Sequence, residues 1–250
     1  MSPLGPQPIV LGGPINESQL PASVVSSSGG TGTNLVHQAK GGIAIGEGAS
    51  VGAGTGNTAL GVGALGANTE GTENIAVGGK ALIRNTTGVG NVAVGFEALT
   101  LNTTAINNVA IGRRALEQNI EGYDNVAIGL GGLFTNTTGA YNVGVGYEAG
   151  VNIHTGTRNT IVGSLAVAVG AATSFGTAIG YGTKVGSGSV AIGASNVAAS
   201  AEAKGENEIQ IGVAAHKLAF CGKTPIKPSE AAHTETTAAL WSHLEALGLA

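Results

Sequence analysis

The sequence predicts an all-β solenoid in which short parallel strands stack coil upon coil. Two observations carry this prediction: an asparagine recurs with a fixed 17-residue period, and each one opens a five-residue aliphatic phrase that closes in glycine. A third is composition, because 44 of the 250 residues are Gly and 42% are hydrophobic, but only 4% are aromatic. Such a chain can fill only a thin core of small side chains in repeated layers.

The repeat has seven copies in fixed register. Aliphatic or β-branched residues mostly take the first and third positions after Asn, and Ala mostly takes the second. Strand side chains alternate between faces, so both faces are apolar and we expect both to be covered. Each coil should hold this strand, a Gly turn, a second short strand around an Ala-Leu pair and an Asn/Thr/Gly turn. The predicted repeat residues are Asn57, Asn74, Asn91, Asn108, Asn125, Asn142 and Asn159, with Gly61, Gly78, Gly95, Gly112, Gly129, Gly146 and Gly163.

Less regular copies of the phrase flank this block, ending at Gly46 before it and at Gly212 after it, which places the repeat domain at 41–213. A coil this thin can bury one strand face against its own second strand. The other face needs a partner, and an identical chain related by a symmetry axis is the simplest one. We therefore expect the protein to associate with copies of itself.

The segment 1–40 differs from the repeats, because five prolines lie between Pro3 and Pro21. Proline disfavours helix and favours extended chain. A disordered leader is one interpretation. We favour an extended Pro/Ser/Gly-rich arm over 1–40 that docks the protein to a larger particle, because a bare linker would not need aliphatic residues. The candidate docking residues are Ile9, Val10, Leu11, Ile15 and Leu20.

The C-terminal part loses the repeat, and an irregular connector is expected over 214–228. Ser229 is suited to cap a helix within 229–250, and Gly248 to end it. One apolar stripe marks this helix, which would be marginal alone but could form a bundle around a symmetry axis. The stripe comprises Leu240, Trp241, Leu244 and Leu247.

Phrases such as NVAVG at 91–95, with Ala-Leu-x-x-Asn-Thr-Thr segments between copies, resemble the head repeats of YadA-type trimeric adhesins. Related repeats occur in bacteriophage tail fibres. The resemblance covers about 170 of the 250 residues. It implies that each chain forms a parallel β-roll and that three chains pack into a homotrimer.

The connector from Phe220 to Ile226, followed by a short helix ending in Leu-Gly-Leu, resembles the C-terminal end of phage fibre and decoration proteins. We therefore expect a structural and adhesive protein of the virion, a trimeric phage tail fibre whose N-terminal arm contacts other virion proteins. The alternatives are a head fibre or decoration protein, a fragment of a bacterial trimeric surface adhesin, and a tail spike that hydrolyses glycans. An adhesin would be expected to need export and anchor segments, which the sequence does not display.

Composition and motifs argue against an enzyme, a cofactor or a metal site. Charged residues make up 10% of the chain and its net charge is −4, without a basic block for nucleic acid or an apolar run for membrane insertion. The G-x-G-x-x-G match at 61–66 lies inside the repeat and lacks the strand and helix of a dinucleotide site. The five His show no ligand spacing, although His216 or His243 on a symmetry axis could bind a metal.

Exposed turns could instead bind a glycan of the host surface. Tyr and Arg at loop tips are suitable contact residues, although turn chemistry and solubility explain them equally simply. The candidate glycan contacts are Arg113, Tyr123, Tyr141 and Arg158.

Overall fold

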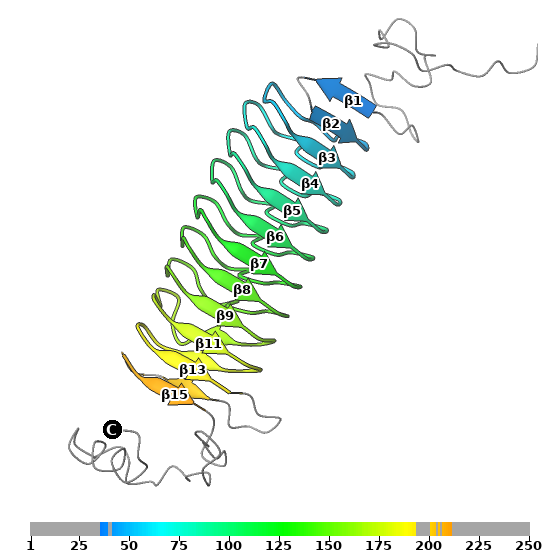
Figure 1. Ribbon diagram of the computed structural model, residues 1–250. Helices are drawn as coiled ribbons and strands as arrows, with labels where there is room; N and C mark the ends of the chain where they lie inside the picture. The colour runs from blue at the N-terminus through cyan, green and yellow to red at the C-terminus, as the bar shows by residue number, and fades with distance from the viewer. Residues whose placement is uncertain (1–35, 40–41, 194–200, 204, 206, 212–250) are drawn as a thin grey trace, which may run out of the picture.

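The computed structural model describes residues 36–39, 42–193, 201–203, 205 and 207–211. It confirms an all-β parallel solenoid with 17-residue coils, drawn as a rod of stacked strands in Figure 1. The predicted docking residues, the connector and the C-terminal helix lie outside the described residues. Residues 36–39, which the sequence placed in the arm, form a strand that pairs antiparallel with the first strand of the rod.

The strands form two sheets, one of 12 strands in the order β1-β2-β3-β4-β5-β6-β7-β8-β9-β11-β13-β15 and one of three strands in the order β10-β12-β14. Their bounds are β1 Val36–Ala39, β2 Gly42–Ile45, β3 Thr58–Leu60, β4 Ile75–Val77, β5 Val92–Val94, β6 Val109–Ile111, β7 Val126–Ile128, β8 Val143–Val145, β9 Thr160–Val162, β10 Val167–Ala168, β11 Thr177–Ile179, β12 Lys184–Val185, β13 Val190–Ile192, β14 Glu202–Ala203 and β15 Ile209–Ile211.

The stacking brings equivalent residues of successive coils together. In the regular coils Val92 of β5 pairs with Val109 of β6, and Val109 pairs with Val126 of β7. The period then changes, because the step from Thr177 to its partner Val190 is shorter than a regular coil, and the step from Val190 to Ile209 is longer. In-register pairing of parallel strands satisfies the backbone of each coil with that of its neighbours.

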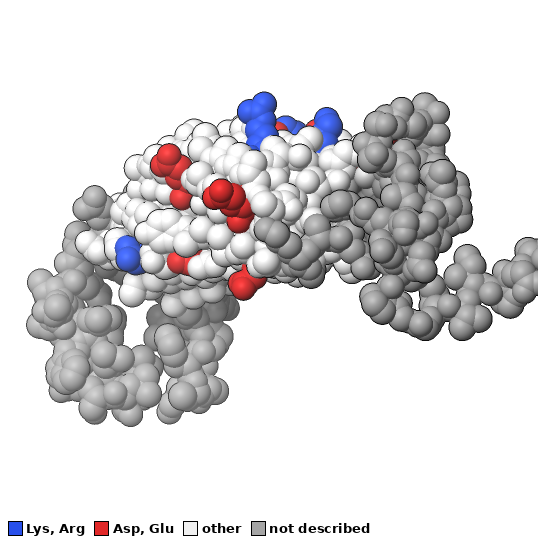
Figure 2. Space-filling view, turned by 90° about the horizontal axis from the view of Figure 1, so that it is seen from above, with Lys and Arg blue, Asp and Glu red and all other residues white. Residues whose placement is uncertain are grey.

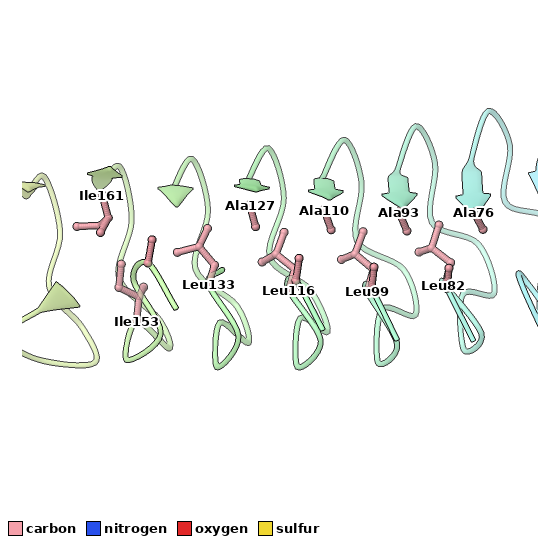
Figure 3. Packing of buried hydrophobic residues seen from close by; sticks show 14 of the residues in the cluster. Ala76, Leu82, Ala93, Leu99, Ala110, Leu116, Ala127, Leu133, Ile153 and Ile161 are labelled. Carbon is pink, nitrogen blue, oxygen red and sulfur yellow. The ribbon is translucent and has the colours of Figure 1, made fainter. Parts of the chain in front are cut away.

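The core is a double row of small and branched side chains between the two walls of each coil (Figure 3). The central residue of each three-residue strand from β3 to β13 points inward, and Ala76, Ala93 and Ala110 are fully buried. Leu82 and Leu99, from the opposite wall, are also fully buried and fill the space that the alanines leave. The narrow interior therefore selects Ala on the strand and Leu opposite it.

The expectation of a second short strand around each Ala-Leu pair is wrong for the regular coils from β3 to β8. Residues 61–67 and their equivalents are turns, and the leucine has a left-handed backbone, with φ of 51° at Leu82 and Leu99. A positive φ is incompatible with a strand. The stack is still hydrogen-bonded there, because the Leu82 N–H donates to the Ala98 carbonyl at 3.0 Å. Second strands occur farther along, as β10, β12 and β14.

The residue that closes each strand must be glycine because the backbone of the next coil lies too close for a side chain. Gly78 has a φ of 128°, which side chains rarely adopt, and a Cβ there would lie 2.6 Å from the carbonyl oxygen of Gly95. Equivalent glycines have φ between 123° and 142°. The coil spacing therefore excludes a side chain at this corner.

Where the regular coils end, the large and small core residues change places between the strand and the opposite wall. The inward position of β9 is Ile161 instead of Ala, and the equivalent of the opposing leucine is Gly150. A Cβ at Gly150 would lie 2.7 Å from Leu133 Cδ2 and 3.6 Å from Ile161 Cγ1. A larger strand residue is thus accommodated by removing the side chain opposite it.

Candidate functional site

The outer face of the 12-stranded sheet is a continuous aliphatic surface, which we call the outer sheet face. It consists of the first and third residues of the parallel strands, such as Val109 and Ile111 of β6. These positions carry Val, Ile, Leu or Thr in every such strand from β3 to β15, and β2, which begins one residue early, contributes Ile43 and Ile45. Several remain 37–75% exposed within the single chain. Within the single chain the alanine face is covered and the outer sheet face is not.

The predicted asparagines form a buried ladder inside the corner before each strand. All seven, Asn57 through Asn159, are fully buried. Each Oδ1 of the first six accepts the backbone N–H of the asparagine one coil on, at 2.9–3.1 Å. Each Nδ2 donates to a carbonyl of the following coil, at 2.6–2.8 Å. These residues satisfy the backbone of the turns and are not available for a ligand.

A second ladder, which the prediction left among the turns, joins Asn68, Asn85, Asn102, Asn119 and Asn136 through side-chain amides 2.8–3.2 Å apart. It ends because the next equivalent residue is Ile153. Asn136 Oδ1 is consequently buried without a hydrogen-bond partner among the described residues.

The residue before each ladder asparagine, or before its equivalent in the later coils, always has a left-handed backbone. We call these positions the pre-Asn column. Its φ values lie between 53° and 69°. The backbone N–H of Arg158 donates to the Ala140 carbonyl at 3.0 Å, and the other positions from Glu73 onward donate to the preceding coil in the same way. The column comprises Gly56, Glu73, Gly90, Asn107, Asp124, Tyr141, Arg158, Phe175, Gly188 and Asn207.

Three bulky side chains occupy this column in the consecutive coils that lead into β8, β9 and β11. Gly, Asn and Asp tolerate a left-handed backbone, but Tyr141, Arg158 and Phe175 have no such preference. A bulky residue in this conformation costs on the order of 1 kcal/mol or more. The chain therefore retains these side chains at a conformational cost that Gly56, Gly90 and Gly188 avoid in other coils.

The three side chains join Tyr123 in one exposed group, the aromatic–arginine cluster. The rings of Tyr123 and Tyr141 meet edge to face, with centroids 5.2 Å apart and an interplanar angle of 79°. Arg158 Cζ lies 5.0 Å from the ring centroid of Tyr141 and 5.5 Å from that of Phe175. The guanidinium is thus held between two rings, and the tyrosine and phenylalanine side chains are 40–59% exposed.

The electrostatics of the cluster favour the neutral form of Tyr141. Its hydrogen bond with Tyr123 and the charge interaction with that phenol raise the pKa of Tyr141, desolvation and nearby Asp124 add to this, and Arg158 opposes it. In the described part of the chain the ion pairs join Lys80 to Glu97, Arg114 to Glu117 and Lys184 to Glu202. Arg158 accordingly has no carboxylate partner among the described residues.

The structure places Arg113, the fourth candidate glycan contact, in a different group. Arg113 Cζ lies 5.9 Å from the Phe96 ring centroid, and Lys80 Nζ lies 5.8 Å from the same ring. Arg113 follows the strand-closing Gly112 and therefore lies at the opposite end of the strand from Tyr141. Three of the four predicted contacts meet, and the fourth does not.

Sequence reasoning missed Phe175, which completes the cluster, and Asp124, which lies beside it. The signal was available, because Asp124, Tyr141, Arg158 and Phe175 follow one another at the period of the repeat and all precede a strand. Lysines, arginines, aspartates and glutamates are sparse on the face of the rod seen in Figure 2.

Within 36–39, 42–193, 201–203, 205 and 207–211, no group of three or more His, Cys, Asp or Glu could hold a metal ion. The same residues contain no helix that could span a membrane. In comparisons with known proteins, no family model, curated protein or solved structure matches the chain.

Proposed function

We propose that this chain is a structural subunit of a homotrimeric fibre on a bacteriophage particle, docked by its N-terminal arm and attached to the host surface through its repeat domain. The outer sheet face is the observation that carries the proposal. Copies of the same chain, and not a small-molecule site, account for its length and chemistry. The resemblance to trimeric adhesin heads and phage fibres supports the number three and the virion.

The outer sheet face has the character of half of a buried interface. The outward residues of its strands are aliphatic or Thr, and none is charged. With 11 parallel strands about 4.8 Å apart, the face runs for roughly 50 Å along the rod. An apolar surface this continuous is atypical of a monomer exposed to water. Parallel copies around an axis would bury it along the whole rod and leave the pre-Asn column free to reach the host.

The assembly can be tested by comparing two charge insertions in purified full-length protein. Ile111 is 39% exposed on the outer sheet face, so Ile111→Asp should leave a single coil intact while placing a carboxylate in the proposed interface. The control Thr87→Glu places a carboxylate on an exposed turn where Glu70 and Glu121 stand in equivalent coils. Light scattering should give a mass of three chains for wild type and control, and a lower mass for Ile111→Asp.

A folded wild-type monomer, or a trimer indifferent to Ile111→Asp, would refute the assembly. The virion assignment is tested separately by labelling purified particles with an antibody against the chain. Label at a fibre supports it, and its absence from particles contradicts it. Release of sugar from host polysaccharide by the purified protein would favour the glycan-hydrolysing alternative.

A further inference from the structure

We infer that the aromatic–arginine cluster is a binding site for a carboxylate-bearing polysaccharide, with Arg158 as the residue that recognises the carboxylate. This inference rests on the proposed function only in that a host-surface glycan is its natural ligand. The backbone of the column, the geometry of the guanidinium and the charges around it each support such a site.

The fold itself does not require the cluster. The pre-Asn column stacks through backbone hydrogen bonds, and Gly56, Gly90 and Gly188 fill it without a side chain. A strained conformation that the architecture does not need points to a functional role for the side chain. Tyr141, Arg158 and Phe175 carry this strain in three adjacent coils.

The guanidinium of Arg158 is oriented by the rings around it. Its Cζ lies 5.0 Å and 5.5 Å from the ring centroids of the residues before and after it in the column, and its N–H groups donate in the plane of the guanidinium. In that plane a guanidinium matches the two oxygens of a carboxylate. The stacking also fixes the side chain before a ligand arrives, which lowers the entropy lost on binding.

The guanidinium of Arg158 is open to solvent and can reach an external anion. Arg158 is exposed, and within the described residues no carboxylate pairs with it. Arg114 offers the contrast, because it also stacks on a ring, that of Phe134 at 4.6 Å, but it is paired with Glu117. Both arginines have a left-handed backbone, with φ of 57° at Arg158 and 60° at Arg114, but only Arg158 is left for an external anion.

The aromatic rings identify the rest of the ligand. Tyr123, Tyr141 and Phe175 are 40%, 44% and 59% exposed, so their rings are accessible to an apolar surface. Polysaccharide rings present such a surface together with hydroxyls that the tyrosine hydroxyls can bind. The cluster spans four coils, about 14 Å, which suits an extended polymer. A net charge of −4 and nearby Asp124 disfavour duplex nucleic acid, which carries one phosphate charge per about 1.7 Å of its axis.

The experiment measures binding of polygalacturonate to the full-length protein by titration calorimetry. Its methyl ester, which keeps the sugar rings and removes the charge, and single-stranded DNA are the comparison probes. Wild type should bind polygalacturonate and should bind the ester and the DNA much more weakly. Arg158→Gln should weaken binding about tenfold or more, as expected for losing a charge-assisted hydrogen bond. Arg158→Lys should restore only part of it, because an ammonium lacks the planar fork.

Tyr141→Gly separates a binding role from a structural one. Glycine suits the left-handed backbone, so the variant should fold and melt close to wild type while its affinity for polygalacturonate falls several-fold. The control Arg84→Gln makes the same change of charge at an exposed arginine beside Asn85 and should bind as wild type.

The inference is overturned if wild type does not bind polygalacturonate, if the ester or DNA binds equally well, or if Arg158→Gln has no more effect than Arg84→Gln. Light scattering on the same samples keeps the two proposals apart. Three chains without polysaccharide binding would reject this site and leave the assembly intact. A monomer that binds polygalacturonate through Arg158 would do the reverse.

Discussion

Replacing Asn108 by alanine tests whether the buried asparagine ladder holds the coils together. Asn108 Nδ2 donates to Asn91 Oδ1, the Ile106 carbonyl and the Gly122 carbonyl at 3.2, 3.1 and 2.8 Å. Its Oδ1 accepts the backbone N–H and the Nδ2 of Asn125 at 3.1 and 3.0 Å. Asn108→Ala removes all five bonds.

The magnitude follows from the partners that remain. The Gly122 carbonyl keeps the Nδ2 of Asn119 at 2.8 Å, and the Ile106 carbonyl keeps the N–H of Asp124 at 3.2 Å. The N–H of Asn125 loses its only side-chain acceptor and stays buried, which costs about 1–3 kcal/mol. With the net loss of the other bonds, at about 1 kcal/mol or less each, we expect the free energy of unfolding to fall by roughly 3–5 kcal/mol.

The assay is urea denaturation followed by circular dichroism, at one fixed protein concentration because association would contribute to the measured stability. Asn107→Gly is the matched control, since Asn107 is the exposed neighbour with a φ of 56° that glycine accommodates. It should change the free energy of unfolding by less than about 1 kcal/mol. Equal losses for both variants, or a loss below about 1 kcal/mol for Asn108→Ala, would show that the ladder does not carry the stability assigned to it.

Three further outcomes follow. Gly78→Ala should prevent normal folding, because the added Cβ would lie 2.6 Å from the backbone of the next coil. The control Gly79→Ala should remain folded by circular dichroism, because its added Cβ would have the Phe96 ring, at 3.3 Å, as its nearest contact. Leu116→Ala should lower the free energy of unfolding by about 2–5 kcal/mol, since the leucine is fully buried and its neighbours are held by the stack; equal urea midpoints would contradict this. The pKa of Tyr141 should lie above the usual tyrosine value of about 10. The resulting contribution to stability is present below that pH and is lost as the pH rises through the folded-state pKa. Tyr123→Phe should lower the pKa of Tyr141, as measured in a phenolate absorbance titration.

The coil period and parallel register could be predicted from sequence because stacking requires the same residue types at the same corners. Asn91 and Gly95 meet their counterparts one coil on, and both tolerate few substitutes there. The turn at Ala98-Leu99 could not be predicted in this way. Leucine has no preference for a φ of 51°, and only closure of the coil imposes it.

Local sequence patterns also could not show which face of the strand points into the core. Alternation defines two faces, and hydrophobicity alone would place Val92 and Val94 inside rather than Ala93. The opposing Leu99 leaves room only for Ala93, so the larger side chains face outward. For the candidate site, the choice of Tyr and Arg in exposed turns predicted Tyr123, Tyr141 and Arg158 but missed Phe175. Phe175 belongs to the cluster because of its position in the pre-Asn column, and that position is defined by the closed coil and not by residue type.

The identical bonding of successive coils between β4 and β7 makes the number of coils a variable that evolution can change in whole steps. Removing residues 91–107 would bring Asn74 next to Asn108, with the same residue types at both corners and the same donors and acceptors. The rod would shorten by about 4.8 Å, and the contacts at both ends would stay the same because each coil contacts only its neighbours. Duplication of one period would lengthen it equally simply, so reach can adapt independently of whatever the two ends contact.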